Sequence, residues 1–107
     1  MQSKPLHEAL RDADKVLRAF LDEDGRIVRM PAKHSKRLVL LDHVCRVFEP
    51  GVRYAEPEVN VLLRAFNDDV AMLRRYLVDE GFMTREGGVY WRSGGTFHGL
   101  DSGGTSD

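Results

Sequence analysis

Apolar residues recur in the first part of the chain at the spacing of one helical face. The repeating positions, at intervals of four, three, four and three residues, are Leu6, Leu10, Ala13, Leu17 and Phe20. Residues at such intervals lie along one stripe of an α-helix. The pattern therefore predicts a helix over residues 3–21, with Ser3 as its N-cap and Pro5 in its first turn, where no hydrogen bond is lost.

The apolar stripe of this first helix has two possible partners. It either packs on the rest of its own chain or pairs with a second copy, since two-fold dimers are the commonest assemblies of soluble proteins. The residues of the predicted homodimer seam are Leu6, Leu10, Leu17 and Phe20. Both alternatives are open at the level of the sequence.

The next segments predict a short strand and a second, more apolar helix. Gly25 ends the first helix, and residues 26–30 (RIVRM) read as a strand that Pro31 terminates. A helix is expected from residues 33–35 to Phe48, before the stop signal Pro50-Gly51. Only a narrow wedge of this helix is polar, so we expect it to lie at the centre of the fold or in a dimer interface.

Two more helices follow with a tight polar turn between them. Pro57 fits only the first turn of a helix, which places the start of the third helix at residues 56–57. Asp69 is an N-cap for a fourth helix over residues 69–80, which ends at Gly81. Two helices with few residues between them form the helix-turn-helix arrangement.

A hairpin is predicted after the fourth helix. Residues 82–85 and 89–92 are strand-like and are joined by Glu86-Gly87-Gly88, with Tyr90 and Trp91 on opposite faces. The fold class is therefore α+β, mainly α: a winged helix-turn-helix with an extra N-terminal helix. We expect an amphipathic helix in residues 1–25, the winged-helix domain in residues 26–92, and a disordered Gly/Ser-rich tail in residues 93–107.

With these elements in place, the chain resembles a bacterial family, the domain of unknown function numbered 2087. The resemblance covers residues 31–92, opens with PAKHSKR, and is carried by Tyr54, Glu56, Glu58-Val59-Asn60, Leu63, Asp69, Leu73-Arg74-Arg75, Leu77-Val78-Asp79, Gly81, Arg85 and Tyr90. The family occurs alone and attached to transcriptional regulators of the ArsR type, so the resemblance implies a link to bacterial transcription and a possible regulator partner protein. Ala55 departs from the family, which often carries a capping hydroxyl residue there; the change costs about 1 kcal/mol of stability.

Positive charge is concentrated in one part of the chain. The net charge is −1, yet residues 26–53 contain seven Lys/Arg against two Asp/Glu. Such a cluster is either a solvated face or a phosphate-binding patch. The candidate DNA-binding residues lie at the start of the second helix, on the fourth helix and on the wing, and they are Lys33, His34, Lys36, Arg37, Arg75, Arg85 and Arg92.

The neighbouring Arg74 has a different expected role. It lies at the border of the buried face of the fourth helix, so we interpret it as a structural ion pair with Glu56 or Glu58. Acidic residues flank both arginines of the fourth helix and oppose phosphate binding; they are Asp68, Asp69, Asp79 and Glu80.

Catalysis and metal binding have little support in the sequence. The four histidines fall in separate elements, and His43 and Cys45 point in different directions on one helix, so we expect no metal site, no cofactor and no enzyme activity. The single Cys45 excludes an internal disulfide, and no apolar run reaches the length of a membrane span. We expect a soluble, cytoplasmic protein that does not enter a membrane.

Two functions therefore remain for this chain. The first is a transcriptional regulator that binds double-stranded DNA through the winged helix and forms a homodimer. The alternative is a protein-interaction or dimerisation module that has a winged-helix shape and binds no DNA, which the acidic third and fourth helices favour.

Overall fold

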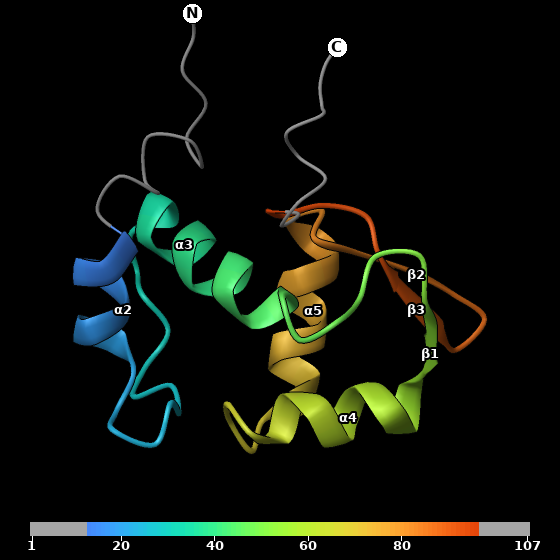
Figure 1. The fold of residues 1–107 in the computed structure, drawn as a ribbon, viewed down its shortest axis with the longest axis horizontal. Helices are drawn as coiled ribbons and strands as arrows, with labels where there is room; N and C mark the ends of the chain where they lie inside the picture. Colours follow the sequence, from blue (N-terminus) through green and yellow to red (C-terminus); the bar gives the residue numbers. More distant parts are fainter. Residues whose placement is uncertain (1–12, 97–107) are drawn as a thin grey trace, which may run out of the picture.

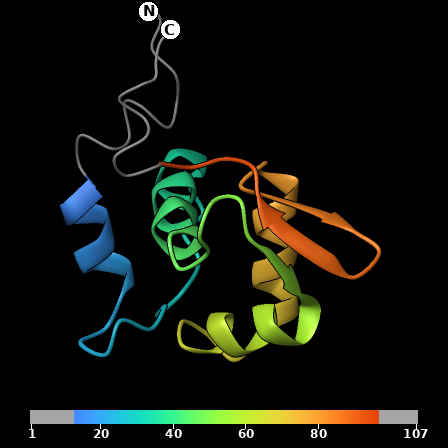
Figure 2. The same ribbon diagram turned by 45° about the vertical axis from the view of Figure 1, so that its right-hand side comes forward.

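The structure is a computed structural model that describes residues 13–96 (Figure 1). Its elements, in chain order, are helices α2 (Ala13–Phe20) and α3 (His34–Cys45), strand β1 (Arg53–Ala55), helices α4 (Glu56–Arg64) and α5 (Val70–Asp79), and strands β2 (Met83–Glu86) and β3 (Val89–Arg92). In both ribbon views α2 and the β2–β3 hairpin lie at opposite ends, with α3 and α5 between them (Figures 1 and 2).

The three strands form one small antiparallel sheet in the order β1-β3-β2. The hairpin pairs Met83 with Arg92 and Glu86 with Val89, while β1 adds to the other edge of β3, with Tyr54 opposite Tyr90. From α3 onward, the order is a helix, a strand, two helices and a hairpin, and β3 of the hairpin also pairs with β1. This is a winged-helix arrangement. The predicted fold class is confirmed, and the short segment before α4 forms strand β1.

Helix α3 lies at the centre of the core. Leu40, Leu41 and Val44 are completely buried, as is Phe48 just beyond the end of the helix. These side chains are buried by the rest of the same chain, so the apolar circumference of α3 needs no second copy to cover it. Of the two expectations for this helix, the central position in the fold is the one observed.

Helices α4 and α5 begin as their sequences predict. Pro57 lies in the first turn of α4, and Asp69 caps α5 by accepting a hydrogen bond from Met72 N at 3.1 Å. At the start of α4, Ala55 has no side-chain oxygen to offer, but Glu58 Oε1 accepts a hydrogen bond from Ala55 N at 2.9 Å. One half of a capping box therefore fixes this helix start.

Helix α2 packs against α3 and completes the core. Val16 and Phe20 are buried, Phe20 with 7% exposure, and Leu17 is partly buried against the same cluster. The described half of the predicted dimer seam thus packs inside its own chain. Leu6 and Leu10 lie outside the described residues.

Residues 26–30 are not a strand, contrary to the sequence prediction. Only an isolated bridge joins Leu21 to Ile27, and Ile27 N donates to Phe66 O at 2.8 Å. Buried Ile27 anchors this loop to the core. Without a neighbouring strand to supply a ladder, the β-favouring residues of RIVRM remain irregular.

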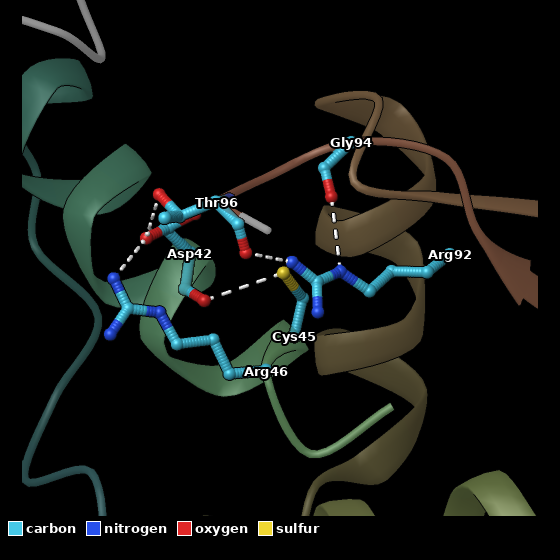
Figure 3. A network of polar contacts seen from close by, with 6 residues as sticks. All are labelled: Asp42, Cys45, Arg46, Arg92, Gly94 and Thr96. Carbon is cyan, nitrogen blue, oxygen red and sulfur yellow. Dashed lines mark hydrogen bonds and ion pairs between the residues drawn. The ribbon is translucent and has the colours of Figure 1, made fainter. Parts of the chain in front are cut away.

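The sequence predicts a disordered tail from residue 93 onward, and this prediction is wrong for residues 93–96. Residues 93–96 form a strap that crosses α3, and Thr96 donates from its N and its Oγ1 to the carboxylate of Asp42, at 2.7 and 3.1 Å (Figure 3). Glycine makes this close approach possible, because Gly95 has φ of 87° and lies against Cys45 and Asp42. Residues 97–107 lie outside the described part.

Candidate nucleic-acid interface

A groove of about 330 Å³ lies between the exposed face of α5 and the hairpin. Its lining comes from α4, α5, β2 and β3 and consists of Glu56, Ala71, Arg74, Arg75, Val78, Asp79, Arg85 and Tyr90. The groove therefore contains three of the arginines that the sequence singled out. Its walls are the second helix of the helix-turn-helix and the wing.

Arg74 is held inside the protein at the edge of this groove. Its Nη1 donates to Asn60 Oδ1, and its Nη2 lies 3.8 Å from Glu56 Oε2. Of the two carboxylates considered as its partner, Glu56 is the one in contact, whereas Glu58 bonds to the backbone of Ala55. Arg74 thus connects α5 to α4, and its position suits orientation of the helices more than contact with a ligand.

Tyr90 forms the floor of the groove and contacts the same carboxylate. Its hydroxyl donates to Glu56 Oε1 at 2.9 Å, and the pKa of Tyr90 is raised by burial and then by this hydrogen bond. Glu56 therefore joins the start of α4 to both α5 and β3. These contacts of Glu56 fix the angle between α5 and the wing.

Arg75 and Arg85 lie on opposite walls of the groove, and both are exposed. Within residues 13–96, Arg75 forms no hydrogen bond or ion pair with another side chain. The guanidinium of Arg85 lies 5.9 Å from the centre of the Tyr90 ring, a cation–π contact that leaves its N–H groups available. These two guanidinium groups are free to bind phosphate or a base edge.

The predicted phosphate anchor at the start of α3 is only partly available. His34 Nε2 donates to Glu80 Oε1 at 3.0 Å. Arg37 donates to the carbonyls of Pro31 and Ala32, and its guanidinium lies 5.4 Å from the Tyr76 ring. These two side chains tie the start of α3 to the loop before it and to α5, so they are less suited to bind DNA.

The two lysines of this predicted anchor are placed differently. Lys33 and Lys36 are exposed, and their side chains have no polar partner among the described residues. Both residues border a hollow next to α2. Lys33 also occupies the N-cap position of α3 without capping it through its side chain.

Arg92 was predicted as a wing contact to DNA, and this prediction is wrong. Its side chain is buried, with 8% exposure. It donates to the carbonyls of Gly94, at 3.2 Å, and of Thr96 (Figure 3). It also donates to the carbonyl of Phe48 at 3.2 Å. The burial of Arg92 could have been predicted from strand alternation, because Arg92 lies on the same face of β3 as Tyr90, which packs in the core. At the base of the wing, the guanidinium supplies the hydrogen bonds that water would otherwise donate to these three backbone carbonyls.

Sequence reasoning also missed the role of Asp42, which lies in the narrow polar wedge of the second predicted helix. Asp42 is 1% exposed and bonds Arg46 Nη2 at 3.0 Å as well as Thr96 (Figure 3). A buried carboxylate needs such partners. The partner in the strap is 54 positions away, and no local pattern indicates it.

Burial shifts the pKa values of Cys45 and His43, two titratable residues near the end of α3, towards their neutral forms. Desolvation raises the pKa of Cys45 to about 12, and its Sγ donates to Asp42 O at 3.3 Å. Burial, followed by the charge of Arg46, lowers the pKa of His43. Within residues 13–96 no three His, Cys, Asp or Glu side chains gather closely enough to hold a metal ion, and no helix there is long and apolar enough to cross a membrane.

Comparison with known proteins gives a family match that covers α3 to β3. Residues 26–92 match the sequence profile of a family described as an uncharacterized protein conserved in bacteria (DUF2087). No curated protein and no solved structure matches the chain. The matched region contains the groove, the sheet and α3 to α5, and it excludes α2.

Proposed function

Because this chain belongs to the bacterial family DUF2087, whose description gives no activity, its function has to be inferred from geometry. We propose that it is a DNA-binding transcriptional regulator of winged-helix type. Duplex DNA is bound by the exposed face of α5 and by the wing, with Arg75 and Arg85 as the two contact residues.

The observation that carries this proposal is the position of Arg75 and Arg85. In a helix-turn-helix the second helix enters the major groove, and here α5 is that helix. Arg75 lies on its exposed face, and Arg85 lies across the groove on β2. Arginine is the commonest side chain to read guanine and also binds phosphate, so one residue suits a base edge and the other the DNA backbone.

Acidic residues near the groove are the main argument against DNA binding. Residues 56–92 contain seven Asp/Glu against five Lys/Arg. Five of the seven carboxylates, however, have partners within the chain: Glu56, Glu58, Asp68, Asp69 and Glu80. Four of these partners are basic side chains: Arg74, Arg26, His34 and Arg37. Much of the negative charge is therefore compensated before DNA approaches.

A protein-interaction module is the second candidate, and one exposed apolar residue favours it. Val61 on α4 is 68% exposed, the most exposed large apolar side chain in the described part of the chain. A partner with an apolar contact and positive charge would suit α4 and its acidic surroundings. Such a module would bind no DNA.

A homodimer is part of the regulator proposal, because dimeric regulators read two-fold operators. Since Phe20 packs in its own core, the seam cannot consist of the four predicted residues alone. Light scattering at micromolar concentration tests the dimer, which would have twice the chain mass of 12.2 kDa. A mass that stays at one chain on concentration contradicts it.

Binding of mixed-sequence duplex DNA to matched arginine variants tests the DNA proposal. Arg75→Ala and Arg85→Ala should each weaken binding, by about 1–3 kcal/mol where a base contact is lost. Arg18→Ala removes an exposed charge on α2, at the end of the molecule remote from the wing, and should leave affinity unchanged. Equal losses in all three variants, or no binding by the parent protein, would contradict the proposal.

A further inference from the structure

A second hollow, of about 300 Å³, lies between α2 and the start of α3. Its lining consists of Lys15, Val16, Ala19, Phe20, Lys33, Ser35 and Lys36. It shares no residue with the groove at the wing. Helix α2 and the wing lie at opposite ends of the molecule, so the two sites are separate (Figures 1 and 2).

The floor of this hollow is apolar and comes mainly from α2. Val16 and Phe20 are nearly buried and form part of the protein core, whereas Ala19 is exposed between them. A floor fixed by core packing is preformed, so a ligand need not order it on binding. The small side chain of Ala19 leaves the space that a larger residue would fill.

The rim of the hollow carries only positive charge. Lys15, Lys33 and Lys36 are exposed, and within residues 13–96 none of their side chains forms a hydrogen bond or ion pair. No Asp or Glu is among the residues that line the hollow, whereas Glu56 and Asp79 line the groove at the wing. Three ammonium groups around an apolar floor attract an anion and lower the desolvation cost of its charged group.

We propose that this hollow binds a small organic acid, a carboxylate carried on an aromatic ring or a short apolar chain. The apolar body covers Val16, Ala19 and Phe20, and the carboxylate contacts the lysines, with Ser35 as a further hydrogen-bond donor. The volume lies at the lower end of the range for small-molecule sites, which restricts the ligand to one or two rings. An inorganic anion has no body to cover the floor.

The hollow is formed partly by residues outside the region that matches the family. Lys33, Ser35 and Lys36 belong to the region that matches the family, whereas Lys15, Val16, Ala19 and Phe20 precede it. The N-terminal helix therefore adds a ligand site to the family domain. A regulator with such a site would respond to an organic acid, although binding of the acid does not depend on binding of DNA.

Titration of the isotope-labelled protein with 2-naphthoate, followed by amide NMR shifts, tests the site. We expect saturable shifts confined to α2 and the start of α3. The neutral analogue 2-naphthamide has the same ring system without the charge, and its affinity should be at least about tenfold lower, equivalent to about 1.4 kcal/mol. Equal binding of acid and amide, shifts spread over other elements, or no saturation at the solubility limit of the acid would each overturn the proposal.

Substitutions identify the residues that hold the acid. Lys33→Gln and Lys36→Gln should each weaken naphthoate binding several-fold, and Ala19→Trp should abolish it by filling the hollow while the exposed position keeps the fold intact. Arg18→Gln is the matched control, since Arg18 is an exposed cation of α2 that does not line the hollow. Loss of binding in Arg18→Gln equal to that in the lysine variants, or full binding in folded Ala19→Trp, would also overturn it.

Discussion

Asp42 and Thr96 are 54 positions apart in the chain, yet two hydrogen bonds join them: Thr96 N to Oδ1 at 2.7 Å and Thr96 Oγ1 to Oδ2 at 3.1 Å. Arg92 donates to the carbonyl of the same threonine from the end of β3. The strap is therefore fastened to α3 on one side and to the wing on the other (Figure 3). Through these contacts the base of the wing is attached to the centre of the core.

The tight fit of the strap can be tested at Gly95. A Cβ at this position would lie 2.7 Å from Cys45 Sγ and 3.0 Å from Asp42 Oδ1, and φ is 87°. Gly95→Ala should therefore lower the free energy of unfolding by about 1–3 kcal/mol beyond the backbone strain alone. Gly51→Ala is the matched control in urea denaturation, because Gly51 has φ of 86° with nothing within 4 Å. Equal destabilisation by the two changes would show that the strap leaves room for a side chain.

Cys45 should be inert towards thiol reagents in the folded protein. Its side chain is buried and its pKa is raised to about 12, so the reactive thiolate is scarce at neutral pH. A chromogenic disulfide reagent should label it only after denaturant is added. Rapid labelling under native conditions would mean that the strap opens readily or that the thiol is not buried.

His43 should make the fold less stable in mild acid. Its folded-state pKa is lowered from the ordinary value of 6.5, chiefly by burial and then by Arg46. The stabilisation is present above about pH 6.5 and is lost as the pH falls towards the folded-state pKa, because the unfolded chain then binds the proton more readily. His43→Gln should therefore show a smaller loss of stability between about pH 7 and pH 5 than the parent protein. An unchanged pH profile would contradict the burial of the imidazole.

Substitution of Arg74 and of the adjacent Arg75 should have different effects on the stability of the fold. Arg74→Ala removes the contacts with Glu56 and Asn60 and should lower the free energy of unfolding by about 1–3 kcal/mol. Arg75→Ala removes an exposed side chain with no polar partner in the described part of the chain, and its effect should stay within about 0.5 kcal/mol. Thermal unfolding of both variants is the measurement, and the reverse order would contradict the assigned roles.

The main elements of the fold followed from local signals in the sequence. Pro57, the Asp69 cap and the Gly87-Gly88 turn predicted α4, α5 and the hairpin within a few residues. These signals act within one helical turn or one hairpin, so a single sequence contains them.

The features that the sequence did not reveal depend on contacts between distant segments. The predicted strand at residues 26–30 lacks a partner strand. The strap is held by Asp42, for which the local pattern indicated only a place in the polar wedge of its helix. For the candidate site, the sequence placed Arg75 among the DNA-binding candidates, and its side chain is exposed, as such a role requires. The use of His34 inside the fold was not predicted, because it requires Glu80, which is 46 positions away.

The salt dependence of duplex DNA binding tests the central claim most directly. Each phosphate contact made by a cationic side chain releases counterions, so the affinity should fall as salt rises from about 50 mM to 200 mM, with a slope of about −0.9 per contact. We predict a slope of about −0.9 for each bound chain of the parent protein, from its single phosphate contact, and a slope near zero for the variant with both Arg75→Ala and Arg85→Ala. An unchanged slope in the folded double variant, or no binding of the parent protein at about 50 mM salt, would contradict DNA recognition by this groove.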